Sequence, residues 1–128
     1  MTTIYVDIDK PYASFVRSYE VDNAIATAEM MIDCPFSIRA RPSATGRTHF
    51  CISTASPISI LKQFEIRAAL EDDPLRLKLD LQRLAQTNDV AFINRIFDEK
   101  FIDGEVKRAG EWIVLHQKPQ TTMKPCEE

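Results

Sequence analysis

Two aspartates one residue apart, Asp7 and Asp9, are the first side chains in the sequence with a potential for chemistry. The segment Thr3–Ile8 alternates between apolar and polar residues, which predicts a half-buried strand. Both carboxylates then point to the polar face, roughly 6 to 7 Å apart along the strand. Carboxylates at this spacing can hold a divalent cation between them. The alternative is structural, because acidic residues at a strand end often begin a turn.

A hairpin is expected to present the basic residues that follow. Ser37–Arg41 and Thr48–Thr54 have the composition of strands, and the segment between them, which includes Gly46, has that of a turn. Glycine permits the positive φ that a tight turn needs. We therefore expect the two strands to pair antiparallel.

Four residues of this hairpin could contact phosphate groups, namely Arg39, Arg41, Arg47 and His49. Alternation along the first strand points Arg39 and Arg41 outward, to the face on which the aspartates lie. Guanidinium groups bind phosphate oxygens in pairs of hydrogen bonds, and a cation on carboxylates neutralises the same oxygens. The set predicts a site for nucleic acid or another phosphorylated ligand. In the simpler interpretation the arginines are solvated and His49 has a structural role.

The distribution of charge supports a local basic patch. The net charge is −3, yet there is no acidic residue between Asp33 and Glu65. That window has a charge of +4, which leaves −7 for the rest, and its basic residues are Arg39, Arg41, Arg47 and Lys62. A positive patch on an acidic protein follows, although a protein that coats DNA would need far more positive charge.

Three helices are expected, over Val21–Ile32, Ile58–Leu70 and Pro74–Gln86, because apolar residues recur there at helical spacing. Asp72 and Asp73 precede the third helix and are interpreted as capping residues. Its leucines also alternate as in a strand, but the capping signal and the length favour a helix. The apolar side of this helix is expected to consist of Leu77, Leu81, Leu84 and Ala85.

The last part of the chain contains two strand-like runs, Ala91–Phe97 and Trp112–Leu115, on either side of a turn at Asp103. From His116 onward, lysine, glutamine, threonine, proline and glutamate dominate the sequence. Such a composition cannot bury enough apolar surface to stay ordered, so it predicts a tail.

The order of elements predicts the fold class. Strand, helix, strand, strand, helices and strand is typical of an α+β fold of the ferredoxin-like or RRM-like split βαβ type, with helices on one sheet face. The expected organisation is a single domain over residues 1–117 and a disordered tail over 118–128. We expect Tyr5, Asp7 and Arg39 on the other, partly open face.

Composition is that of an ordinary globular domain, with 45% hydrophobic and 27% charged residues in 128. The three cysteines, Cys34, Cys51 and Cys126, form no CxxC pair, which argues against a zinc site or a disulfide framework. Apolar runs fall far short of the roughly 20 residues that span a bilayer, and no signal peptide opens the sequence. A cytoplasmic protein with no membrane partner is expected.

Three short segments, Tyr5–Asp9, Ser43–His49 and Ile96–Asp98, resemble the signature motifs of the archaeo-eukaryotic primase and primase-polymerase superfamily. The resemblance implies that Asp7, Asp9 and Asp98 are ligands of Mg²⁺ or Mn²⁺. It also implies that His49, helped by Arg47, contacts a nucleotide phosphate. Arg47 departs from the small hydroxyl residue usual at that place in the superfamily.

A second resemblance covers more of the chain. The segments Arg39–His49, Arg67–Asp80 and Phe97–Lys100, together with Gly104, resemble small proteins of unknown role encoded by archaeal viruses and plasmids. This resemblance implies an origin in an archaeal mobile element and, if that element is a virus, a location inside the host cell.

Two functional hypotheses follow. One is a binding module that uses the arginine-bearing hairpin on nucleic acid, on a protein partner or on a second copy of itself. The alternative is a metal-dependent nucleotidyl-transfer or phosphoryl-transfer enzyme related to the primase-polymerases. The enzyme needs Asp7, Asp9 and Asp98 within a few ångströms of one another, whereas the module does not.

Overall fold

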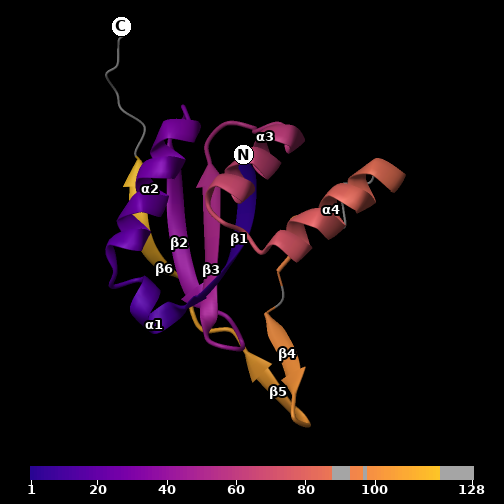
Figure 1. The fold of residues 1–128 in the computed structure, drawn as a ribbon. Helices are drawn as coiled ribbons and strands as arrows, with labels where there is room; N and C mark the ends of the chain where they lie inside the picture. Colours follow the sequence, from indigo (N-terminus) through magenta and orange to yellow (C-terminus); the bar gives the residue numbers. More distant parts are fainter. Residues whose placement is uncertain (88–92, 97, 119–128) are drawn as a thin grey trace, which may run out of the picture.

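The computed structural model describes residues 1–87, 93–96 and 98–118, which form a mixed α+β fold. Four strands make one antiparallel sheet in the order β1-β3-β2-β6 (Figure 1). They are β1 (Thr2–Pro11), β2 (Phe36–Pro42), β3 (Arg47–Thr54) and β6 (Ile113–Lys118). The predicted antiparallel hairpin of β2 and β3 is confirmed, with Gly46 at a φ of 85° in its turn.

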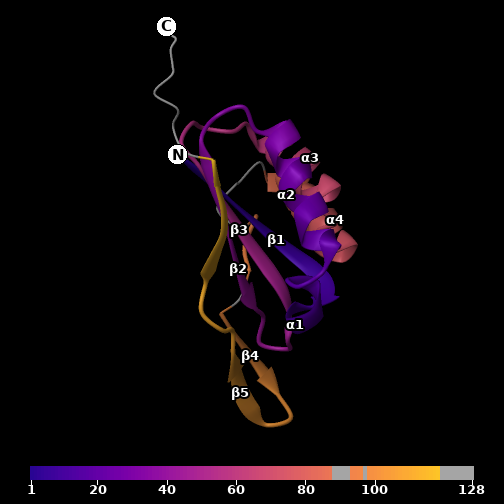
Figure 2. The ribbon, with the colours of Figure 1, turned by 90° about the vertical axis from the view of Figure 1, so that its left-hand side faces the viewer.

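The helices of the described residues are α1 (Tyr12–Phe15), α2 (Tyr19–Met31), α3 (Ile60–Ala69) and α4 (Pro74–Thr87). Figure 2 shows α2 and α3 over one face of the sheet, and Figure 1 shows α4 beyond the β1 edge. The three long helices were all predicted, including the one whose leucines alternate.

Buried apolar residues confirm the predicted register of β1. Ile4, Val6 and Ile8 are at most 2% exposed and pack towards α2 and α3 in the core. On β3, Ile52 lies opposite Ile4 and Phe50 opposite Val6, so the strands share one apolar face. A slip of one residue would have exposed this whole set.

The opposite sheet face is only partly open. Tyr5, Asp7 and Arg39 lie on it with intermediate exposure, as predicted. Arg41 and His49 lie on the same face, yet each is only 5% exposed. The sheet therefore offers a half-covered face rather than an open one.

Side chains and backbone from later segments seal the outer edge of β1. The side chain of Asn94 accepts a hydrogen bond from the Tyr5 amide and donates one to the Thr3 carbonyl, both at 2.8 Å. Asp72 accepts one from the Asp7 amide at 2.7 Å. Two more reach the carbonyls of this edge, from the Asp73 amide to Asp7 and from the Arg76 guanidinium to Tyr5. An edge strand whose backbone groups are hydrogen-bonded in this way offers no template for another strand. The same hydrogen bonds fix the start of α4 beside Asp7.

The prediction of a strand over Ala91–Phe97 is wrong for residues 93–96, which the structure describes and which form no strand. Asn94 has a φ of 56°, and its side chain, rather than its backbone, bonds β1. Residues 91, 92 and 97 lie outside the described residues.

Two findings concern the end of the chain. The turn at Asp103 is confirmed, and it joins two strands that were not predicted, β4 (Glu99–Ile102) and β5 (Glu105–Arg108), in a projecting hairpin (Figure 1). The tail does not begin at His116, because β6 continues to Lys118 and pairs with β2. The rest of the expected tail, residues 119–128, lies outside the described residues.

Candidate functional site

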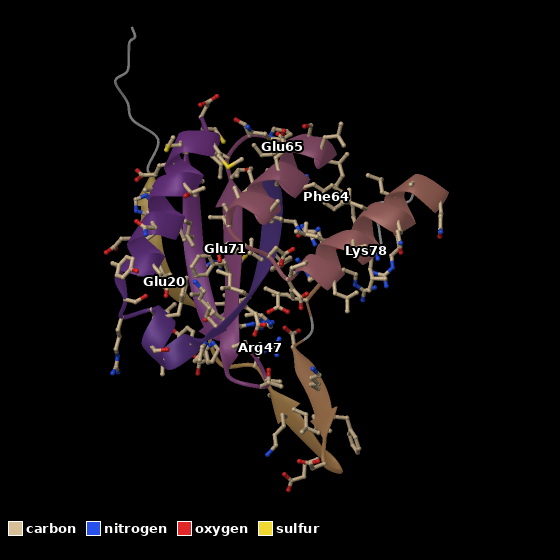
Figure 3. The ribbon with its side chains drawn as sticks, in the orientation of Figure 1. Glu20, Arg47, Phe64, Glu65, Glu71 and Lys78 are labelled. Carbon is tan, nitrogen blue, oxygen red and sulfur yellow. The ribbon has the colours of Figure 1, made fainter. Side chains whose placement is uncertain are left out.

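A cleft of about 940 Å³ lies between α4, the β2–β3 turn and the segment that leads into β4. Asp7 of β1 and His49 of β3 line it, as do Ser43 of the β2–β3 turn and Arg47, the first residue of β3. In Figure 3, Arg47 lies at the end of the sheet from which the β4–β5 hairpin projects. The volume of the cleft is within the range of small-ligand sites.

Asp7, His49 and Arg41 form a row across three neighbouring strands. His49 pairs with Asp7 on one side and with Arg41 on the other. The Arg41 Nε–H donates a hydrogen bond to His49 Nδ1 at 3.1 Å. His49 Nε2 lies 3.9 Å from an Asp7 carboxylate oxygen, too far for a direct hydrogen bond.

Arg41 is held from two further sides. Its guanidinium donates a hydrogen bond to the Asp98 carboxylate at 2.8 Å and lies 4.4 Å from the centre of the Trp112 ring. Asp98 and Trp112 reach Arg41 from segments far along the chain, which is why a short window of sequence does not show the burial of this arginine. In this position Arg41 orients His49 and does not face the solvent.

His49 is neutral at physiological pH. Burial, and then the positive charges of Arg41 and Arg76, lower the pKa of His49 to about 4. Because Nδ1 accepts the hydrogen bond from Arg41, the proton of the neutral ring is on Nε2. The cleft therefore contains a fixed, uncharged N–H donor beside Asp7.

Asp7 is half-buried beside this donor. Burial raises the pKa of Asp7, and the charge of Arg76 partly opposes that effect. Its amide bonds to Asp72 and its carbonyl to the Asp73 amide, so the backbone of Asp7 is held on the outer side of the strand. Its carboxylate is a positioned polar group in the lining of the cleft.

The three aspartates expected to bind metal have different partners. Asp9 pairs with Arg47 at 3.2 Å, Asp98 pairs with Arg41, and Asp7 lies beside His49. In the part of the chain that the structure describes, no three His, Cys, Asp or Glu side chains are placed to hold one metal ion. The described arrangement does not bring the expected Mg²⁺ or Mn²⁺ ligands together.

The cations of the acid-free window do not gather into one patch. Arg47 is exposed at the cleft, Arg41 is buried, and Lys62 lies on α3 beside Glu65. Arg39 lies on the same sheet face but does not line the cleft, and its Nη2 is 3.7 Å from the sulfur of Cys51.

The turn amides near Arg47 are already used within the hairpin. Ser43 Oγ accepts hydrogen bonds from the Thr45 and Arg47 amides at 3.3 and 3.0 Å. The Gly46 amide bonds to the Ser43 carbonyl. An anion at this turn would therefore meet side chains rather than backbone donors.

Sequence reasoning missed most of the cationic lining of the cleft, which comes from Arg76 and Arg83 of α4 and from Arg95 and Lys100 near β4. Arg76 and Arg83 follow Asp72 and Asp80 in an alternating charge pattern, and this pattern was the signal that could have revealed them. Arg95 and Lys100 had no such signal.

An ion network, largely buried, holds the α4 part of this cationic lining in place. Arg67, only 1% exposed, bonds to Asp72 at 2.8 Å and to Asp80 at 2.9 Å. Arg76 bonds to Asp72 at 2.6 Å, and Arg83 to Asp80 at 3.2 Å. Asp72 was expected to cap α4, but it is a buried acceptor in this network. Asp73 alone caps the helix, by accepting a hydrogen bond from the Leu75 amide.

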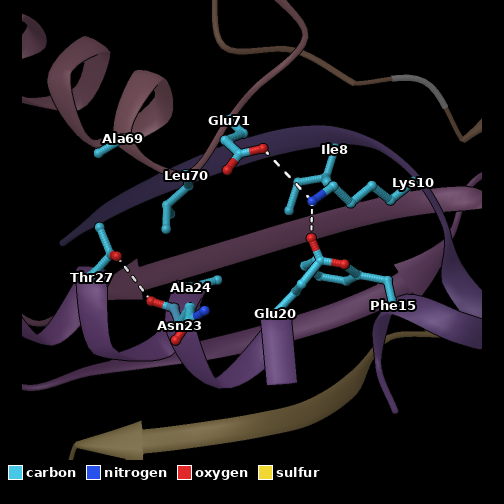
Figure 4. A pocket seen from close by; sticks show the side chains of 10 residues that line it. All are labelled: Ile8, Lys10, Phe15, Glu20, Asn23, Ala24, Thr27, Ala69, Leu70 and Glu71. Carbon is cyan, nitrogen blue, oxygen red and sulfur yellow. Dashed lines mark hydrogen bonds and ion pairs between the residues drawn. The ribbon is translucent and has the colours of Figure 1, made fainter. Parts of the chain in front are cut away.

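A second pocket, of about 100 Å³, lies between α2 and the end of α3 (Figure 4). Lys10 spans it and pairs with Glu20 and, at 3.8 Å, with Glu71. The hydrogen bond that Lys10 donates to the Glu20 carboxylate is the main reason why the pKa of Lys10 is raised. This pocket is small, and the ion pairs that cross it connect β1 to the helices.

No model of a known protein family matches the chain, and the searches of curated proteins and of solved structures found no match. Among the described residues, no helix is long and apolar enough to cross a membrane.

Proposed function

We propose that this protein binds nucleic acid through phosphate groups that enter the cleft beside the β2–β3 turn. The observation that supports this most is the convergence of cations from three separate parts of the chain, the turn, α4 and the approach to β4, on one cleft. Phosphate contacts by lysine and arginine provide most of the sequence-independent affinity of nucleic-acid-binding proteins.

The charges of these cations differ in how far they are compensated. In the ion network, Arg67, Arg76 and Arg83 share the carboxylates of Asp72 and Asp80. Among the described residues, neither Arg95 nor Lys100 has an ion-pair partner. Within the described residues, Arg47 pairs with the exposed Asp9, an interaction that a phosphate can replace at little cost.

His49 would add a neutral donor. With its proton on Nε2, it can donate a hydrogen bond to a phosphate oxygen without changing its protonation. This role agrees with the resemblance to the primase superfamily, in which the corresponding histidine contacts a nucleotide phosphate. Arg41, Asp98 and Trp112 then act as positioning residues for that donor.

The ferredoxin-like arrangement is part of the proposal. It is supported by β3, which lies between β1 and β2 and is antiparallel to both, and by α2, which connects β1 to β2. β6 extends this sheet beside β2.

We prefer binding to a metal-dependent transfer reaction because of where the acids lie. Transfer would need Asp98 to leave Arg41 and join Asp7 and Asp9, which would also release the group that orients His49. Binding needs no such rearrangement.

Titration of a labelled oligonucleotide at several salt concentrations tests the proposal. Arg47→Ala is expected to weaken binding and to reduce the slope of log affinity against log salt by about 0.7, the value for one lost single-strand phosphate contact. Lys62→Ala removes the same charge outside the cleft and serves as the control, with affinity and slope close to those of the wild type. A wild-type protein without affinity for DNA or RNA at low salt would end the proposal.

A further inference from the structure

Apolar side chains line the same cleft as the cations and are called here the apolar wall. It consists of Leu75 and Leu79 of α4, Ile96 of the segment before β4, and Phe101 of β4. Phe101 is 72% exposed and Leu75 is 63% exposed, so these side chains do not contribute to the core. Large apolar groups that stay in solvent beside a cleft mark an interaction surface.

The orientation of α4 explains why the leucines are there. Arg76 and Asp80 are tied into the ion network, and Leu75 and Leu79, which make no such bonds, border the cleft beside them. The helix thus presents both charged and apolar side chains to the cleft.

We propose that Phe101, together with Leu75 and Leu79, contacts the face of an unpaired base, so that the cleft selects single-stranded nucleic acid. This inference rests on the proposed binding of phosphates. A nucleotide has an anionic part and a flat apolar part, and the cleft offers cations and an exposed aromatic ring in one space of about 940 Å³. In a duplex the faces of the bases are covered by their neighbours, so this wall would have nothing to contact. Stacking on aromatic side chains is tolerant of base identity, and little sequence preference is expected.

The test compares three probes with equal numbers of phosphates, namely a single-stranded oligonucleotide, the same strand with abasic positions, and a duplex. The wild type is expected to bind the complete single strand most tightly. Phe101→Ala is expected to weaken that binding by roughly 5-fold to 100-fold per stacked base and to leave abasic binding unchanged. Phe101→Tyr should retain most of the wild-type affinity, because it keeps the ring.

Val106→Ala is the matched control. Val106 pairs with Phe101 across the β4–β5 hairpin and is 54% exposed, but it does not line the cleft. Its removal should leave binding of all three probes unchanged.

The outcomes separate the inference from the function on which it rests. Equal wild-type affinity for the complete and abasic strands, or an equal loss on both with Phe101→Ala, would overturn the stacking wall while phosphate binding stands. Absence of binding to every probe would reject both. Binding of an acidic leucine-containing peptide, with no binding of any oligonucleotide, would assign the cleft to a protein partner and overturn the inference.

Discussion

At the scale of the residue, the state of His49 follows from its neighbours. Arg41 donates a hydrogen bond to the Nδ1 of His49, and Asp98 and Trp112 hold Arg41 in place. Alternation along the strands placed Asp7 and Arg41 on one face correctly, and His49 shares that face. Their burial was not predictable, because the covering groups come from residues more than fifty positions away.

The pKa of His49 gives a test by pH. Because its folded-state value of about 4 is below the ordinary value of 6.5, the unfolded chain binds this proton first as the pH falls. The contribution to the free energy of unfolding is present above pH 6.5 and is lost as the pH falls to about 4. A shift of this size corresponds to about 3 kcal/mol. Urea denaturation of the wild type and of His49→Gln at a series of pH values measures it.

His49→Gln keeps an acceptor for Arg41 but does not titrate, so its stability should fall less than that of the wild type over this range. The raised pKa of Asp7 acts in the opposite direction, since that group favours the folded state as the pH falls through its pKa. Asp7 is present in both proteins, and the difference between them isolates His49. Parallel pH profiles would show that the imidazole is not buried as described.

At the scale of the element, α4 shows both the reach and the limit of sequence patterns. Its start was predictable from Asp73 and Pro74, because capping is local chemistry. Its buried face was not, since Leu81, expected to be inside, is 46% exposed while Asp80 is 3% exposed. Arg67 of α3, a neighbour only in space, provides the partner that allows a carboxylate to replace a leucine there.

Two adjacent aspartates test the buried network. Asp72→Ala removes an acceptor for Arg67 and Arg76 and leaves a buried guanidinium without one of its two carboxylates. The free energy of unfolding is expected to fall by about 3 to 5 kcal/mol. Asp73→Ala removes only the helix cap, for an expected loss of about 1 kcal/mol. Equal losses in chemical denaturation would contradict the difference between the two roles.

At the scale of the whole molecule, the cleft is a product of long-range assembly. The period-two alternation of the strands predicts the sheet and its buried face. The cleft combines β1, β3, α4 and β4, and its cations are scattered among segments that show no common pattern in the sequence. The seal on the edge of β1, made by Asp72, Asp73, Arg76 and Asn94, is what brings α4 and the approach to β4 to the same place.

The most direct measurement is a map of amide chemical-shift changes in the ¹⁵N-labelled protein on addition of a single-stranded oligonucleotide. We expect the changes to cluster at the β2–β3 turn, at His49, in the first two turns of α4 and around Phe101. The outer surface of α2 should remain unchanged and provides the internal reference. Changes confined to α2 or β6, with none at Arg47 or Phe101, would contradict the placement of nucleic acid in the cleft.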